Sequence, residues 1–218
     1  MSAGLLLPCL QPPTWSGSER ALARPLLTEP SPYVPWVALG YDEPEIFRFL
    51  EKDAAPGERA TEALEAEAVA NLQLRPARWQ DLELDLGGFK RLRMLVAGDD
   101  PLAAERVLDQ PFLLEAQRRL EAPGLLLGIP RRGFLVATAL DNNVERVHTF
   151  GAVAATQFQG GESDPLTPAL FTARGGRIAS VVDVVARAVV PPARMEAALA
   201  DAQRSAEAHA AAAEDGER

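Results

Sequence analysis

The chain has 218 residues, of which 47% are hydrophobic and 24% charged, a composition typical of a soluble globular protein with an ordinary core. Its formal net charge of −9 argues against a broad nucleic-acid interface, which needs a basic face, and against binding to an anionic membrane surface. The single cysteine, Cys9, excludes an intrachain disulfide and a cysteine-based zinc site.

The first 33 residues are rich in proline, which removes backbone donors and fixes φ, so we expect no regular element to run through them. They also hold large apolar residues such as Leu5, Trp15 and Tyr33, which a disordered linker rarely keeps. We therefore predict an extended arm over residues 1–33 that packs on the folded body or on another chain. Because the first basic residue is Arg20, the start lacks the basic segment of a secretion signal, and we expect a cytoplasmic protein.

Residues 34–190 are predicted to form a single α+β domain. We expect a short strand over residues 33–41. Its place is at the edge of a sheet, because Pro35 has no backbone N–H to donate to a neighbouring strand. Residues 43–52 are predicted to form one or two helical turns.

The next segment is predicted to form a helix followed by a hairpin. A helix capped by Thr61 is predicted to end at Pro76, with its glutamates on the solvent side. Leucines alternate with acidic residues over 81–86, which predicts a strand, and Gly87 and Gly88 then predict a tight hairpin turn.

The clearest helix start is the sequence Asp99-Asp100-Pro101. Either aspartate can cap the helix. Proline suits the first helical position, because the backbone N–H that it lacks would have no partner within the helix. A second proline is predicted to divide this segment into helices over about 101–109 and 111–120.

The remainder is predicted to hold two more hairpins and two helices. Strands over 125–129 and 134–140 flank a turn, a helix follows from Val144, and the glycine pair at 175–176 marks the other hairpin. Such connections favour an α+β fold with a mainly antiparallel sheet and helices packed on one face. Residues 191–218, rich in alanine, are predicted to form a helix with a frayed tail.

Asp100 and His148 are the candidates for catalysis, although the sequence holds no nucleophile elbow, phosphate loop or dinucleotide fingerprint. Helix capping already explains at least one residue of the Asp99-Asp100 pair. Glu145 and His148 lie three residues apart on a predicted helix and could reach one metal, but a single such pair is more simply an ion pair. We therefore predict no cofactor and no metal, and the sequence does not favour an enzyme.

Arg131 and Arg132 occupy the turn in GIPRRGF, between two apolar runs. A guanidinium suits a carboxylate or phosphate ligand. The two side chains splay at a turn, however, and in an acidic protein an internal partner is easily found. The hairpin turn with a salt bridge is therefore favoured over ligand binding.

Four short motifs occur in the order AVANL (68–72), GDDPLAAERVL (98–108), LLLGIPRRGFLVA (125–137) and PLTPALFTARGGRI (165–178). Their order resembles the YtpQ-like family of uncharacterised bacterial proteins, a domain of unknown function, over roughly residues 34–185. The resemblance implies a bacterial cytoplasmic α+β protein without established catalytic residues. Asn71, Asp100, Pro130 and Arg132 fall on its motifs, so we take Asn71 and Arg132, with neighbouring Arg131, as candidate binding residues.

Three functions remain open. The preferred one is a non-enzymatic protein, adaptor-like or immunity-like, whose acidic residues steer it to a basic protein partner. The first alternative is a small-ligand enzyme or hydrolase with a pocket near residues 129–133 and His148. The second is a structural protein that self-assembles through its N-terminal arm or its C-terminal helix.

Overall fold

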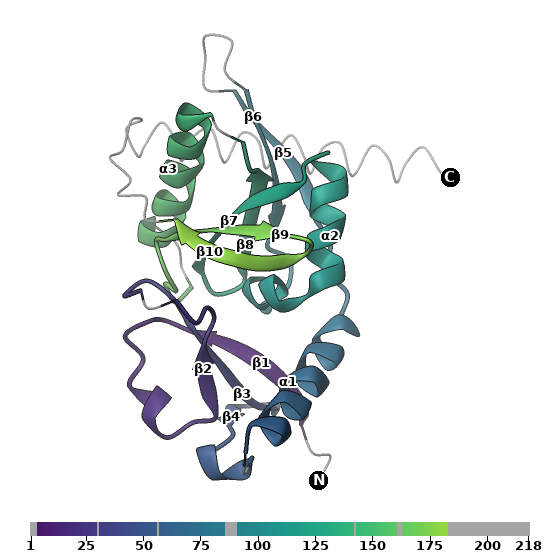
Figure 1. Cartoon of the computed structure of the whole chain (residues 1–218), viewed down its shortest axis with the longest axis vertical. Helices are drawn as coiled ribbons and strands as arrows, with labels where there is room; N and C mark the ends of the chain where they lie inside the picture. The colour runs from purple at the N-terminus through teal and green to yellow at the C-terminus, as the bar shows by residue number, and fades with distance from the viewer. Residues whose placement is uncertain are drawn as a thin grey trace.

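The computed structural model describes residues 4–29, 31–55, 57–85, 91–141, 143–160 and 163–182. Within these ranges the chain forms two antiparallel sheets, one below the other in Figure 1, and three α-helices, so the α+β class with hairpins is confirmed. The helix predicted over 191–218 and the Gly87-Gly88 turn lie outside them. Within the described ranges, no helix is long and apolar enough to cross a membrane.

The smaller sheet has a central strand, β3, with β1 on one side and β2 and β4 on the other. Its strands are β1 (Leu5–Gln11), β2 (Ala23–Pro25), β3 (Trp36–Asp42) and β4 (Phe47–Phe49). The predicted edge position of the strand at 33–41 is wrong, because the strand begins after Pro35 and no ladder donor is lost. The helical turns predicted over 43–52 are also wrong, because β4 occupies this segment, followed by the short 3₁₀ helix η2 (Lys52–Ala54).

β1 and β2 belong to the segment predicted as an extended arm, and both pack on the chain's own β3. Between them lies a short 3₁₀ helix, η1 (Ser16–Glu19). Pro8 pairs with Leu39 in the β1–β3 register. The Leu39 backbone is bonded to Leu22 and Leu50 on the other side of β3, so this pair needs no ladder donor from Pro8. A proline is therefore compatible with the middle of β1.

Helix α1 (Glu58–Gln73) covers one face of the smaller sheet and leads into the larger one. It begins three residues before the predicted cap, and the Thr61 hydroxyl donates back to the Gly57 carbonyl over 3.3 Å. Ala68 and Leu72 are fully buried, and Ala68 packs with Leu6 and Leu39 in a small apolar cluster.

The larger sheet has the strand order β10-β9-β7-β8-β6-β5, and every neighbouring pair is antiparallel. Its strands are β5 (Gln80–Asp85), β6 (Arg91–Ala97), β7 (Gly124–Arg131), β8 (Phe134–Ala139), β9 (Leu170–Arg174) and β10 (Arg177–Val182). The hairpins predicted at 130–133 and 175–176 are confirmed, with positive φ at Gly133, Gly175 and Gly176.

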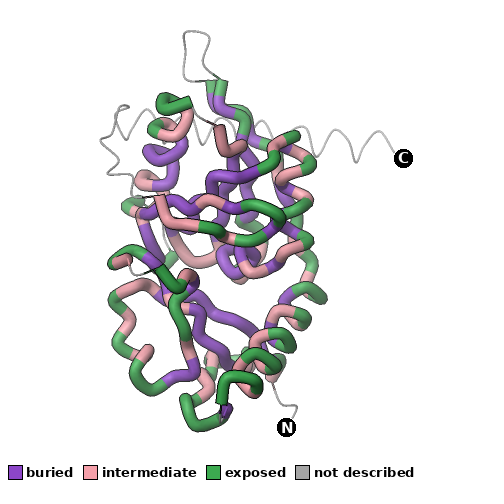
Figure 2. Tube along the Cα trace, in the orientation of Figure 1, coloured by how far each residue is buried: buried purple, intermediate pink, exposed green. Residues whose placement is uncertain are grey.

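Helices lie on both faces of the larger sheet, so the prediction of helices on one face is wrong (Figure 1). The 3₁₀ helix η3 (Ala104–Leu108) and α2 (Gln110–Arg119) pack with Leu125 and Leu127. Helix α3 (Val144–Gly160) packs on the opposite face with Leu126. β7 is correspondingly buried along almost its whole length, as the purple tube in Figure 2 shows.

One apolar core joins the two sheets. Leu10 and Val37 from the smaller sheet are buried in the same cluster as Leu95, Ile129 and Phe171 from the larger one. The Thr167 hydroxyl adds a hydrogen bond of 2.7 Å to the Tyr33 carbonyl. The two sheets therefore fold around a shared interior.

The β9–β10 turn provides a matched pair of glycines. Both have positive φ, but a Cβ on Gly175 would meet open space, whereas one on Gly176 would lie 2.6 Å from the Gln110 carbonyl oxygen. We predict that Gly175→Ala lowers the free energy of unfolding by about 1 kcal/mol through backbone strain, and that Gly176→Ala lowers it by about 3 kcal/mol or more. Urea unfolding of both variants checks this, and equal losses would contradict the predicted contact.

Candidate functional site

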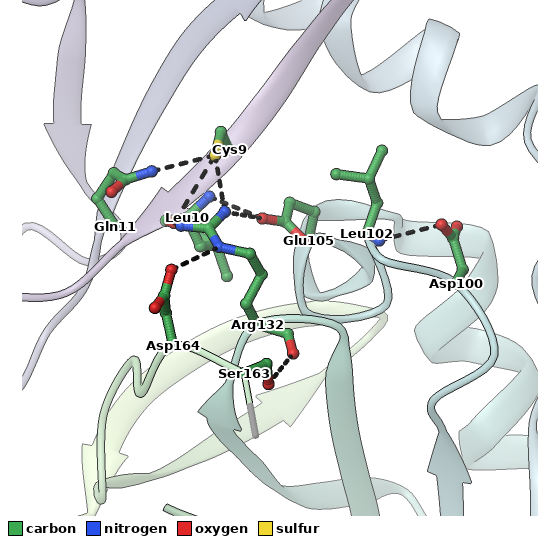
Figure 3. Close-up of polar contacts among 9 residues, drawn as sticks. All are labelled: Cys9, Leu10, Gln11, Asp100, Leu102, Glu105, Arg132, Ser163 and Asp164. Carbon is green, nitrogen blue, oxygen red and sulfur yellow. Dashed lines mark hydrogen bonds and ion pairs between the residues drawn. The ribbon is translucent and has the colours of Figure 1, made fainter. Parts of the chain in front are cut away.

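The outer edge of β1 is hydrogen-bonded by side chains instead of by another strand. The Leu10 amide donates to Glu105 Oε1 over 2.9 Å, and its carbonyl accepts from Arg132 Nη2 over 3.3 Å (Figure 3). Further along the strand, Asn71 Nδ2 donates to the Leu6 carbonyl over 3.0 Å. Side chains from α1, η3 and the β7–β8 turn thus form hydrogen bonds with the edge backbone of β1. This edge is buried in the contact between the two sheets, which we call the junction.

Glu105 is the buried acid of this junction, with no exposed surface. Burial raises its pKa to about 7, although the Leu10 amide and the Arg132 guanidinium, 4.0 Å away, favour the charged form. Among the described residues, its Oε2 has no hydrogen-bond partner. The carboxyl group therefore changes its charge near neutral pH at the centre of the contact between the two sheets.

Arg132 contacts four groups from the β7–β8 turn. Besides the Leu10 carbonyl and Glu105, its Nη1 lies 3.1 Å from Cys9 Sγ and its Nε lies 3.9 Å from Asp164 Oδ2. Burial raises the pKa of the Cys9 thiol, and the nearby Glu105 raises it further, against the opposing effect of Arg132. Cys9 is therefore a neutral thiol at neutral pH, which disfavours a nucleophilic role.

A second buried cluster surrounds Arg106, which is 2% exposed. Its Nη1 donates to Asp109 over 3.1 Å, its Nη2 donates to the Arg75 carbonyl over 2.7 Å, and Nη2 lies 3.5 Å from Asp100 Oδ2. Asp109 also accepts from the Phe112 amide and so caps α2. This cluster joins the end of α1 to η3 and α2.

A pocket of about 470 Å³ opens beside the β7–β8 turn. Its lining comes from the loop after β6, from the β7–β8 turn and from the loop before β9: Gly98, Asp99, Asp100, Pro101, Arg131, Arg132, Gly133, Phe134 and Ser163. Three of the candidate residues, Asp100, Arg131 and Arg132, therefore meet in one pocket. Arg131 lies over the Phe134 ring at 5.1 Å, and Asp100 Oδ1 accepts from the Leu102 amide over 3.0 Å. The predicted helix cap at Asp99 or Asp100 is wrong, because the helical segment is the 3₁₀ helix η3, which begins at Ala104 and has no side-chain cap.

The other candidates lie elsewhere. His148 and Glu145 are exposed on α3 and do not line this pocket, and Asp141, one turn before them, pairs with Arg146. Asn71 lies on α1 against β1. Among the residues that the structure describes, no group of three or more His, Cys, Asp or Glu side chains could hold a metal ion.

A larger groove of about 680 Å³ lies on the smaller sheet, formed by the proline-rich segment and the start of β3. Its lining is mostly apolar: Pro13, Thr14, Pro25, Leu27, Thr28, Glu29, Ser31, Pro32, Val34 and Trp36. Trp36 Nε1 donates to the Pro13 carbonyl over 3.2 Å, which fixes the ring in the groove.

Sequence reasoning missed Glu105 and the groove. Glu105 lies next to Arg106 in a short apolar segment, and a charged pair there is the one local signal of a buried role. Its partner Leu10 is 95 residues away, so no spacing rule connects them. The prolines that line the groove predict an extended arm, and nothing in their spacing indicates a groove.

No family model, curated protein or solved structure matches the chain. The resemblance to the YtpQ-like family stays a prediction.

The junction predicts a pH dependence for Glu105→Gln. The folded state holds the Glu105 proton more tightly than the unfolded state, so the wild type loses stability as pH rises from about 4.5 to about 7, and the loss is complete above that range. Relative to the wild type, Glu105→Gln should therefore become more stable by about 2–3 kcal/mol between pH 5 and pH 8. Urea unfolding at pH 5, 6, 7 and 8 measures this difference.

Glu83→Gln is the matched control, because Glu83 lies exposed on β5 and pairs with Arg91. Its difference from the wild type should change by less than about 0.5 kcal/mol over the same range. A pH-independent difference for Glu105→Gln would show that Glu105 does not titrate differently in the folded and unfolded states.

Proposed function

We propose that this protein acts by binding another protein, and that the groove on the smaller sheet receives an extended apolar segment of that partner. The observation that carries the proposal is the groove itself, which has a volume of about 680 Å³. Its described lining includes three prolines, Leu27, Val34 and Trp36. Grooves that combine proline and aromatic side chains suit extended peptides, because such peptides bury alternate side chains and lose little conformational entropy.

The groove is preformed, which supports a binding role. Proline fixes φ along its lining, the Trp36 ring is held by Pro13, and the Tyr33 carbonyl is held by Thr167. A rigid groove orders few of its own side chains on binding, so more of the interaction energy appears as affinity.

Charge defines the chemistry of the partner. The chain carries a net charge of −9, and Glu29 is the only charged residue among the described residues that line the groove. We therefore propose a segment with aliphatic or proline residues at its centre and basic residues on its flanks, which the acidic surface would attract. A cytoplasmic location fits a chain whose one cysteine is a buried free thiol.

The pocket beside the β7–β8 turn lies near residues 129–133, where the small-ligand alternative places it, but its lining does not include His148. Self-assembly through the C-terminal helix concerns residues outside the described ranges. Protein binding is therefore the function that the described geometry supports best.

Selection of a random twelve-residue peptide library on the full chain tests the proposal. We predict that the selected peptides share aliphatic or proline residues with basic flanks. We also predict that Thr28→Trp, at an exposed groove position, weakens the best peptide at least tenfold by filling the groove. Fluorescence anisotropy of labelled peptide measures the affinities.

Leu74→Trp is the control, because Leu74 is 79% exposed at the end of α1 and does not line the groove. It should leave peptide affinity unchanged. Selection of no peptide above background, or equal affinity for the wild type and Thr28→Trp, would contradict binding in the groove.

A further inference from the structure

Among the residues that the structure describes, four charged side chains line the pocket beside the β7–β8 turn, two of each sign. Asp99 and Asp100 come from the loop after β6, and Arg131 and Arg132 come from the turn. We propose that this pocket binds a small zwitterion of the amino-acid type, with its ammonium group at the aspartates and its carboxylate at Arg131.

The charge of the lining selects this class of ligand. The two aspartates and two arginines cancel in formal charge, so a simple anion meets carboxylates and a simple cation meets guanidiniums. A ligand that carries both charges satisfies both loops at once. A guanidinium has five N–H donors in its plane, so Arg131 can bind a ligand carboxylate in addition to its contacts within the chain while its face rests on the Phe134 ring.

The charged groups are held in place by contacts with the rest of the fold. Asp99 Oδ2 accepts from Gln80 over 2.9 Å and from Arg78 over 3.3 Å. Asp100 is held by the Leu102 amide and by Arg106. Because these contacts fix the side chains before a ligand arrives, little entropy is lost on binding.

Arg132 connects the pocket to the junction between the sheets. One side of its guanidinium bonds the Leu10 carbonyl and Cys9 (Figure 3), while the residue also lines the pocket. Pro101 and Phe134 add apolar lining, which favours a zwitterion with an aliphatic side chain. The volume of about 470 Å³ is within the range of small-molecule sites.

Isothermal titration calorimetry of the full chain at pH 7 and low salt tests the proposal with matched probes. Leucine and glycylleucine carry both charges at different separations, whereas isocaproate lacks the ammonium group of leucine and isoamylamine lacks its carboxylate. We expect at least one zwitterion to bind with a Kd below about 1 mM, and both single-charge probes to bind at least tenfold more weakly. Tighter binding of leucine would identify the ligand class as a free amino acid, and tighter binding of glycylleucine would identify it as a short peptide.

Asp99→Asn and Arg131→Gln should each weaken the bound zwitterion at least tenfold, because each removes one of the two charge contacts. Glu83→Gln and Arg91→Gln, which remove an exposed ion pair of 3.2 Å between β5 and β6, should leave the affinity unchanged. Thr28→Trp should also leave it unchanged, so failure of the groove proposal is distinguishable from failure of this one. No binding of either zwitterion at 10 mM probe, equal binding of isocaproate or isoamylamine, or full affinity in either pocket variant would overturn the proposal.

Discussion

The backbone of Leu10, bonded between Glu105 and Arg132, is the interaction on which the arrangement of the two sheets depends. An edge strand buried against another sheet must find partners for its amides and carbonyls, since each one left unpaired costs about 1–3 kcal/mol. Here one carboxylate and one guanidinium supply both partners at a single residue. This requirement fixes η3 and the β7–β8 turn against β1, and it explains why charged side chains lie inside an otherwise apolar junction.

The same requirement positions the pocket. Arg132 bonds the junction and lines the pocket. Asp100 precedes η3 in the chain, lies near the buried Arg106 and also lines the pocket. Charges that hold the fold together therefore form part of a concave surface open to solvent. Such charges are already oriented and desolvated by the fold, so further contacts with a ligand need little rearrangement. A structural role and a binding role for these residues are thus compatible.

The hairpins could be predicted because their signals are local. Alternation of side chains and a pair of glycines at 175–176 occur within a few residues, and the structure has strands on both sides of that turn. The helices on both faces were missed although β7 contains an unbroken apolar run, LLLGI, which is typical of a strand buried on both sides. Glu105 could not be predicted, because its pairing with Leu10 depends on how two sheets meet and not on any spacing along the chain.

The proline-rich segment shows how one sequence property can limit regular structure and still shape a concave surface. Prolines argue against regular structure where they remove ladder donors, but Pro8 occupies a position in β1 where β3 requires no donor. Pro13 and Pro32 lie outside the strands, Pro25 ends β2 at its pair with Trp36, and all three line the groove. Fixed φ values there reduce the number of conformations open to the unfolded chain and keep the groove in one shape when folded. The residues that exclude a long helix or strand from this segment are therefore the residues that make a rigid concave surface possible.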